Sequence, residues 1–275
     1  MTQHKILEAV IALARQAGQL ILQYYQDVQH VAVTHKADQS PLTQADLAAH
    51  HCIVDGLEQL GLGWPIISEE STDIPDFSGH SVCYWLVDPL DGTKEFLKGN
   101  DEFTVNIALI DCCDTYPVLS VVYAPALDTL YYAAQGQGAY KQKDQLPPRR
   151  IHCNEKRPKQ WQVAVSRSHP SPELQQALQP LGDYRLVAAG SSLKLCLVAE
   201  GQADLYPRLG PTSKWDIAAG QCIVEQAGGQ VVYLSNRQRF AYPDQDCRQL
   251  NRPFLAYGMA QCPDLAWLLA DEIVK

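Results

Sequence analysis

The sequence predicts an α/β protein in which helices pack on β-sheets, and three patterns support this prediction. Two amphipathic stretches near the start predict helices, the middle of the chain reads as consecutive strands, and the second half alternates strands with helices. In the first stretch, apolar residues recur at helical spacing from Ile6 to Tyr24. The second helix is expected from about Thr43 until Gly61, a glycine that ends the apolar stripe.

Short apolar runs that end in acidic residues predict buried strands. Residues 65–68 run into Glu69 and Glu70, and residues 84–87 run into Asp88. Further strands are expected at 103–110, 118–123, 129–134, 161–166, 184–188, 204–207 and near residues 231 and 255. Helices are expected between and after the later strands, at 172–178, 193–200, 216–227 and 264–273.

A stretch rich in proline, lysine and arginine, residues 141–157, is the expected border between two lobes. The first, residues 1–150, is an α+β lobe that contains most of the candidate metal ligands. The second, residues 151–275, is an α/β lobe that contains Asp216 and the residues of the substrate side. A chain of 275 residues is long enough to bury a substantial core as one domain or as two lobes.

The composition is that of an ordinary globular protein, with 46% hydrophobic and 19% charged residues. The formal net charge of −9 argues against nucleic-acid binding as the main role, because an acidic surface repels a phosphate backbone. The same charge would repel any anionic substrate, and a bound metal ion is the simplest group that could offset it.

The cysteine pattern predicts a reduced, intracellular protein. None of the nine cysteines forms a C-x-x-C pair or a compact zinc-type cluster with histidine, and they are scattered: Cys52, Cys83, Cys112, Cys113, Cys153, Cys196, Cys222, Cys247 and Cys262. The N-terminus is polar without an apolar signal core, and no apolar run reaches the length of a membrane span. We therefore expect the protein in the cytoplasm or on a membrane surface.

Four acidic residues stand where a predicted strand ends or a predicted helix begins: Glu69, Asp88, Asp91 and Asp216. Acids at such positions can converge on one cleft. Magnesium prefers oxygen ligands and is held by a few carboxylates together with water and substrate phosphate. These residues therefore predict a divalent-cation site, although each acid taken singly is equally well explained as a turn residue or a helix cap.

The run from Asp88 to Thr93 combines features of a metal site and of an anion site. Pro89 restricts the turn, so that both carboxylates and the Leu90 carbonyl can face one ion. Gly92 and Thr93 stand where a helix could begin, and the backbone N–H groups at a helix start bind phosphate. Phosphoryl hydrolysis requires a metal site that adjoins a phosphate site in this way. Two metal ions about 3.5–4 Å apart would stabilise the attacking and the leaving oxygen.

Asp46 has two interpretations. Thr43 and Asp46 have the spacing of a capping box, with aspartate in place of the usual glutamate or glutamine at the third helical position. On the residues alone, a helix cap is favoured over a catalytic role for Asp46.

Three motifs, in the order and spacing found here, resemble the lithium-sensitive, magnesium-dependent phosphatases of the inositol monophosphatase superfamily over almost the whole chain. They are Ser68–Glu69–Glu70, the run Asp88–Thr93, and Trp215–Asp216 at the start of a late helix. Within that superfamily, the chain looks most like the CysQ-type 3′(2′),5′-bisphosphate nucleotidases, on the segments 166–169, 190–194 and 210–216. Lys214 is a departure, because an acidic residue is more usual there, and it could alter local charge and substrate affinity.

The resemblance implies a five-layer α-β-α-β-α sandwich and two or three magnesium ions, with Li⁺ as an inhibitor. Asp46 and Thr93 would form a hydrogen-bonded pair that activates the attacking water, so the resemblance moves Asp46 from cap to catalyst. The Gly92 and Thr93 amides would hold the scissile phosphate. The implied metal ligands are Glu69, Asp88, the Leu90 carbonyl, Asp91 and Asp216. The implied substrate contacts are Glu69, Leu90, Asp91, Gly92, Thr93, Ser191, Lys194 and Asp216.

The substrate implied by the resemblance is adenosine 3′,5′-bisphosphate, cleaved to AMP and phosphate, with the sulfated form as a second substrate. Arg167, Lys194 and Arg208 are expected at its second phosphate or ribose, with solvated surface charge as the alternative. His169 is expected on the substrate side or as a plain loop residue. Two other functions stay open: the same chemistry on inositol monophosphate, a sugar bisphosphate or NADP, and a noncatalytic phospho-ligand sensor.

Water is expected to attack directly, without a phosphoenzyme, because no Cys, His or Ser stands in a nucleophile motif beside the acids. The resemblance also implies a protein of the cytoplasm, or one that is peripheral on the cytoplasmic face of the inner membrane. The sequence does not determine the oligomeric state.

Overall fold

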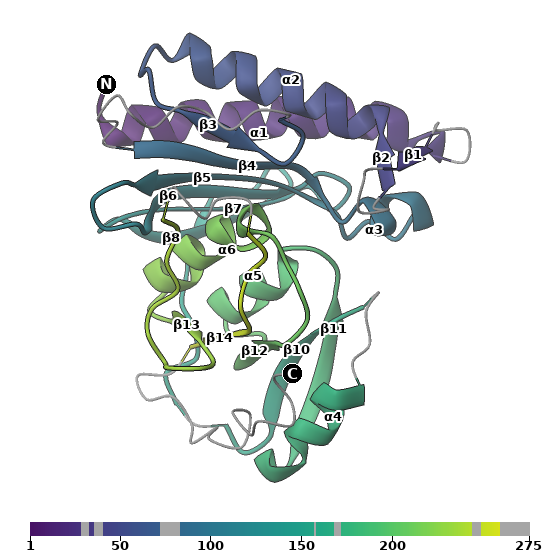
Figure 1. Ribbon diagram of the computed structural model, residues 1–275, viewed down its shortest axis with the longest axis vertical. Helices are drawn as coiled ribbons and strands as arrows, with labels where there is room; N and C mark the ends of the chain where they lie inside the picture. The colour runs from purple at the N-terminus through teal and green to yellow at the C-terminus, as the bar shows by residue number, and fades with distance from the viewer. Residues whose placement is uncertain are drawn as a thin grey trace.

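The computed structural model of the chain describes residues 1–28, 33–35, 41–71, 83–156, 158–167, 172–243 and 249–258. Its elements stack in five layers, in the order helices, sheet, helices, sheet and helix (Figure 1). Clusters of buried apolar side chains fill the spaces between these layers. The predicted α-β-α-β-α sandwich is therefore confirmed.

Helices α1 (Gln3–Tyr25) and α2 (Gln44–Gln59) cover the outer face of the first sheet (Figure 1). The apolar residues whose spacing predicted α1 form its buried face. Ile6 and Ile21, for example, belong to one cluster with side chains of the sheet. A two-stranded hairpin leads into α2, formed by β1 (Val33–His35) and β2 (Pro41–Thr43).

Seven strands follow one another in chain order across the first sheet, and neighbours are antiparallel except for the parallel pair β3 and β4. Because β3 and β4 are parallel, their carboxyl ends lie at the same edge of the sheet, and the short helix α3 (Thr93–Lys98) begins just beyond β4. The strands are β3 (Ile66–Ser68), β4 (Cys83–Asp91), β5 (Thr104–Asp111), β6 (Pro117–Ala124), β7 (Thr129–Ala134), β8 (Gly138–Lys143) and β9 (Arg149–Ile151).

The predicted lobe border, residues 141–157, contributes strand residues to the first sheet, which the sequence did not indicate. Lys141 in β8 and Arg149 in β9 are Cα partners across these two strands. The buried Glu200 carboxylate compensates both charges, because it lies 2.6 Å from Lys141 Nζ and 3.2 Å from Arg149 Nη2. Basic residues that suggested a linker are thus partners of an acid from another element. The division at residue 150 into two lobes stays a prediction.

The second sheet has the strand order β11-β10-β12-β14-β13. Helices α5 (Leu193–Ala199) and α6 (Lys214–Gln226) lie between the two sheets (Figure 1). Helix α4 (Pro172–Leu178), which continues into a 3₁₀ turn at Gln179–Leu181, packs on the other face of the second sheet. The helix predicted at 264–273 lies outside the described residues. The strands are β10 (Trp161–Ser166), β11 (Tyr184–Ala189), β12 (Leu205–Arg208), β13 (Gln230–Tyr233) and β14 (Phe254–Tyr257).

All seven cysteines in the described part of the chain are free thiols, and Cys153, Cys196 and Cys222 are buried. Burial raises the pKa of Cys153 and of Cys222 to about 12, so these thiols pack as small apolar groups. Among the helices of the described residues, none is both long enough and apolar enough to cross a bilayer.

Gly220 lets α5 and α6 approach each other closely between the two sheets. A Cβ atom at this position would lie 2.4 Å from Leu195 Cδ1 and 2.7 Å from Leu195 Cβ. We predict that Gly220→Ala lowers the free energy of unfolding by about 1–3 kcal/mol through overpacking, although alanine favours a helix by roughly 1 kcal/mol over glycine. Urea unfolding measures this change. The cost should shrink in a Leu195→Ala background, and an equal cost in both backgrounds would contradict the clash.

Candidate active site

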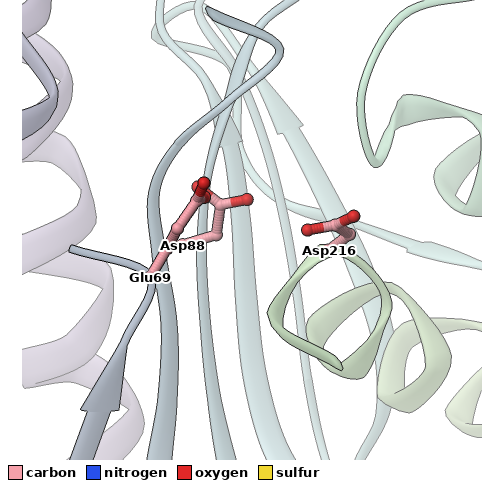
Figure 2. Close-up of side chains that lie close together, drawn as sticks. All are labelled: Glu69, Asp88 and Asp216. Atoms are coloured by element: carbon pink, nitrogen blue, oxygen red, sulfur yellow. The ribbon is translucent and has the colours of Figure 1, made fainter. Parts of the chain in front are cut away.

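Three of the predicted acids converge from separate elements of the fold. Glu69 directly follows β3, Asp88 lies in β4, and Asp216 lies in the first turn of α6. One ligand oxygen from each of the three lies within 4.8 Å of the others. Figure 2 shows Glu69 and Asp88 side by side, with Asp216 reaching towards them from the start of α6. The structure therefore brings together residues that are up to 147 positions apart (216 − 69) in the sequence.

Backbone pairing explains why Glu69 and Asp88 are neighbours. Ser68 and Val87 are Cα partners in the parallel pair β3–β4, and the Glu69 amide donates to the Val87 carbonyl at 3.0 Å. The next residue on each strand is therefore acidic, at the same edge of the sheet. Two like charges at this spacing destabilise the fold unless a cation compensates them.

A β-bulge aligns Asp88 with Asp91. Residues three positions apart in a regular strand point to opposite faces. Here Asp88 pairs with Asn106 and Asp91 pairs with Thr104, so β4 has one more residue than β5 across this interval. The Leu90 amide donates to Asp88 Oδ1 at 3.1 Å within the irregular stretch. The extra residue places both acids on one side of the ladder, as the Asp88–Asp91 motif predicted.

Asp91 lies beside the group of three acids and is held by polar partners of its own. Ser192 Oγ lies 2.9 Å from Asp91 Oδ2, and Asn106 Nδ2 donates to the same oxygen at 3.4 Å. Burial raises the pKa of Asp91 to about 6, while the nearby Lys194 ammonium lowers it and Glu69 raises it further. Asp91 is therefore a partly buried acid within the electrostatic field of the cluster.

The donor set fits a hard divalent cation. Burial raises the pKa of Asp216 well above its usual range, and the charges of Asp91 and Glu69 act in the same direction. Burial lowers the pKa of the Lys194 ammonium to about 8. One ammonium carries a single positive charge, so this lysine cannot compensate all of the neighbouring carboxylates. Carboxylates without a thiol or imidazole among them suit magnesium better than zinc or copper. A bound cation would keep these acids ionised at neutral pH.

Asp46 contacts Thr93 and caps α2 at the same time. Thr93 Oγ1 donates to Asp46 Oδ1 at 3.2 Å. Asp46 Oδ2 accepts from the Thr43 amide at 2.8 Å and from Thr43 Oγ1 at 2.5 Å, which completes the capping box. The cap that the sequence favoured is therefore present, and so is the contact with Thr93 that the resemblance implied.

A cavity of about 680 Å³ opens beside the acids, a size typical of sites for small-molecule ligands. Most of the predicted site residues line it, whereas Asp46, Asp88 and Leu90 lie behind the wall. The acidic end is lined by Glu69, Asp91, Gly92, Thr93 and Asp216. The rest of the lining combines polar and basic groups with an apolar surface, and includes Ser191, Lys194, Arg208, Val165, Leu178 and Leu186.

The predicted basic residues have different surroundings. Lys194 lines the cavity, and its Nζ donates to the Ser191 carbonyl at 2.5 Å. Arg208 also lines the cavity and donates to the Pro211 carbonyl at 2.9 Å. Arg167 differs from expectation, because its guanidinium binds Glu102 and it is absent from the cavity wall. His169 lies outside the described residues.

Lys214 points away from the cavity. Its Nζ lies 5.2 Å from the centroid of the Phe240 ring and 5.8 Å from that of Tyr242, and it donates to the Ala241 carbonyl at 3.5 Å. The unusual lysine next to the Trp215–Asp216 motif therefore contacts an aromatic pair, and it is not among the residues that line the cavity.

Two residues at the site were missed from the sequence, Ser192 and Asn106. Ser192 Oγ lies 2.5 Å from the Asp216 carbonyl oxygen as well as 2.9 Å from Asp91, so its single proton can serve one of them at a time. Asn106 Nδ2 donates to Ser192 Oγ at 2.8 Å. An amide side chain inside the run 103–110, which is apolar apart from Thr104 and Asn106, was the available signal for Asn106.

Fold and site together define a class of protein, and the chain belongs to the inositol monophosphatase family, whose profile matches residues 2–261. The chain is 50% identical over 226 residues to the 3′(2′),5′-bisphosphate nucleotidase CysQ of Salmonella typhimurium, and equally to that of Escherichia coli, covering 82% of this chain and 89% of each relative. A crystal structure of CysQ from Bacteroides thetaiotaomicron has 37% sequence identity and a TM-score of 0.79, covering 92% of this chain and 97% of that one.

We predict that magnesium stabilises this protein through the acidic cluster. Asp88→Asn removes one charge while its side-chain oxygen can still accept from the Leu90 amide. Without magnesium, the variant should melt at the same or a higher temperature than the wild type, because like charges repel less. The rise in melting temperature with added magnesium, worth about 2.7 kcal/mol at a hundredfold excess over Kd, should be lost.

Thermal unfolding with and without magnesium measures this effect. Asp111→Asn is the matched control, since Asp111 stands at the other end of β5 and caps a turn by accepting from the Cys113 amide at 2.7 Å. A full magnesium response in Asp88→Asn would contradict the assignment of the ion to this cluster.

Proposed function

We propose that this protein is a magnesium-dependent phosphatase that hydrolyses the 3′-phosphate of adenosine 3′,5′-bisphosphate to AMP and phosphate. The observation that supports this most is the convergence of Glu69, Asp88 and Asp216 at one end of a cavity large enough for a nucleotide. The relatives at 50% identity are named as 3′(2′),5′-bisphosphate nucleotidases, which favours this substrate over others. The sulfated nucleotide is a second candidate substrate.

The proposed metal ligands are Glu69, Asp88, the Leu90 carbonyl, Asp91 and Asp216, which would hold two or three magnesium ions. When bound, magnesium supplies Lewis-acid stabilisation of the negative charge on the transferring phosphate. The chain itself orients the acids through the parallel β3–β4 pair, the bulge in β4 and the first turn of α6. Lithium is proposed to inhibit the enzyme at the same metal site.

Thr93 and Asp46 are proposed to activate the attacking water. Thr93 lines the cavity, and its hydroxyl proton is directed to Asp46 Oδ1 at 3.2 Å. The lone pairs of Thr93 Oγ1 can therefore accept a hydrogen bond from a water molecule in the cavity. A proton leaving that water passes to Thr93 as the threonine proton passes to Asp46, which raises the nucleophilicity of the water oxygen.

The turn after β4 is proposed to hold the scissile phosphate. Gly92 has φ 91° and ψ 42°, a left-handed conformation that favours glycine and turns the backbone at the start of α3. The first N–H groups of a helix have no partner within the helix, so the Gly92 and Thr93 amides can donate to phosphate oxygens. Ser191, Lys194 and Arg208, which also line the cavity, would contact the second phosphate or ribose.

Phosphate release from two substrates tests this function. We expect wild-type protein to release phosphate from adenosine 3′,5′-bisphosphate only with magnesium, and with a higher kcat/KM than from inositol 1-phosphate. EDTA should abolish release and magnesium should restore it. A preference for inositol 1-phosphate would contradict the nucleotide assignment, and no release from a panel of phosphorylated metabolites would favour a noncatalytic sensor.

Thr93→Ala tests the proposed route of the proton. Loss of the hydroxyl should lower kcat by about 10²–10⁴-fold, because the water loses its proton relay to Asp46. Magnesium affinity should change little, since Thr93 contributes no carboxylate. Thr93→Ser retains the hydroxyl and should retain most of the activity. The measurements are kcat and the magnesium dependence of melting, and normal turnover in Thr93→Ala would refute the role of Thr93.

The proposed place of action is the cytoplasm or the cytoplasmic face of the inner membrane. The absence of a membrane-crossing helix among the described residues is compatible with both.

A further inference from the structure

The Glu102 carboxylate is bound by two segments of the chain. Arg167 Nε lies 2.6 Å from Glu102 Oε2, and Arg167 Nη2 lies 2.8 Å from Oε1, which forms a bidentate ion pair. The Gly190 amide also donates to Glu102 Oε2, at 2.8 Å. Arg167 Nη2 donates in addition to the Ala188 carbonyl at 2.6 Å. Four hydrogen bonds therefore join the segments that contain Glu102, Arg167 and residues 188–190.

These segments come from different parts of the fold. Glu102 lies between α3 and β5, on the side of the first sheet. Arg167 follows β10, and Gly190 follows β11, which are neighbouring strands of the second sheet (Figure 1). The Arg167 amide donates to the Ala189 carbonyl at 3.2 Å, so the two strand ends are also joined to each other. The ion pair thus links the two sheets at the edge of the site.

The contact at Gly190 is very close. A Cβ atom there would lie 2.5 Å from the Glu102 carbonyl oxygen and 2.9 Å from Glu102 Cβ. The next residue, Ser191, has φ 41°, in the left-handed region. A Cβ atom on Gly92 would lie 3.3 Å from Ser191 Cβ, so the 190–192 turn packs directly on the turn proposed to hold phosphate. The position of this turn is therefore narrowly defined.

The 190–192 turn also contributes to the site itself. Ser191 and Ser192 line the cavity, and Ser192 Oγ contacts Asp91. Asp91 has a second support in Asn106 and in the β4–β5 ladder. Displacement of the turn would therefore change the wall that faces the substrate more than it would change the acids.

We propose that Glu102 and Arg167 are positioning residues, which hold the 190–192 turn against Gly92 and so set the width of the substrate cavity. An exposed ion pair contributes only about 0–1 kcal/mol to stability, so stability alone does not require three hydrogen bonds on one carboxylate. Misplacement of a substrate-binding group by about 1 Å can cost up to about 10²-fold in activity. The effect on substrate binding rests on the proposed function, whereas the effect on the turn does not.

The chain provides a matched control in Arg239 and Glu225. Arg239 Nε lies 2.9 Å from Glu225 Oε1 and Nη2 lies 2.6 Å from Oε2, and Arg239 and Arg167 have the same side-chain exposure of 45%. Neither residue of this second pair lines the cavity. Arg239→Met should therefore remove a comparable ion pair without displacing the 190–192 turn.

The experiment compares Arg167→Met with Arg239→Met in two measurements. Hydrogen exchange should accelerate by about tenfold or more in peptides that span residues 188–192 in Arg167→Met only. The reason is that the Glu102–Arg167 ion pair no longer restrains the 190–192 turn. KM for adenosine 3′,5′-bisphosphate should rise by about tenfold in Arg167→Met, with kcat changed less than about threefold. Arg239→Met should change both by less than about twofold.

Further variants keep the proposal falsifiable if Arg167→Met does not fold. Glu102→Gln removes the negative charge but keeps a side-chain oxygen that can accept from the Gly190 amide. Arg167→Lys keeps the positive charge but cannot form the bidentate hydrogen bonds. Both should raise KM by less than Arg167→Met. The double variant Glu102→Gln, Arg167→Met should be no worse than Arg167→Met, because the pair acts as one unit.

Unchanged exchange at residues 188–192, an unchanged KM, or an equal rise in KM in Arg239→Met would overturn the proposal. If the wild type releases phosphate from inositol 1-phosphate and not from the nucleotide, the proposed function fails, and the same KM comparison is made with inositol 1-phosphate. The exchange measurement tests whether Glu102 and Arg167 restrain the 190–192 turn, whichever substrate the protein hydrolyses.

Discussion

Electrostatic repulsion among converging carboxylates, one buried and the others partly buried at a cavity wall, is the constraint on which the rest of this structure depends. Glu69, Asp88 and Asp216 bring ligand oxygens within 4.8 Å of one another, and Asp91 adds a fourth acid to the same field. Partial burial weakens the screening of these charges by water, so the cluster is unfavourable in the absence of compensation. Lys194 offsets part of the charge. A divalent cation would offset the remaining negative charge, and the proposed phosphatase would use this cation to bind an anionic substrate to an acidic protein.

Rigid backbone elements hold these acids in place against their repulsion. The parallel pairing of β3 and β4 sets Glu69 beside Asp88, and the bulge in β4 turns Asp91 towards the same side. Helix α6 brings Asp216 from between the two sheets, where packing of Gly220 against α5 fixes the helix. Apolar clusters on both faces of the first sheet anchor these elements, so hydrophobic burial supplies the free energy that opposes the repulsion.

Several polar residues of the site have a structural and a proposed chemical role at once. Asp46 completes the capping box of α2 with one carboxylate oxygen and accepts from Thr93 with the other. Asp216 accepts from the Ser213 amide at 2.9 Å in the capping box of α6, while it also belongs to the group of three acids. A carboxylate has two oxygens, so the two roles are compatible. Local sequence patterns could therefore not choose between cap and ligand, because both interpretations describe the same side chain.

The sequence by itself determined the elements whose signals are local. Apolar spacing predicted α1 and α2, and short apolar runs predicted β3 and β4 with acids at their ends, because periodicity depends on neighbours a few positions away. The family motifs also implied that the distant acids meet, whereas only the tertiary structure decided the other long-range contacts. Asn106 and Ser192 are 86 positions apart, Glu102 and Arg167 are 65 apart, and the basic residues of the supposed border bind Glu200. Such contacts arise when two sheets and the helices between them pack, and no residue pattern along the chain records that geometry.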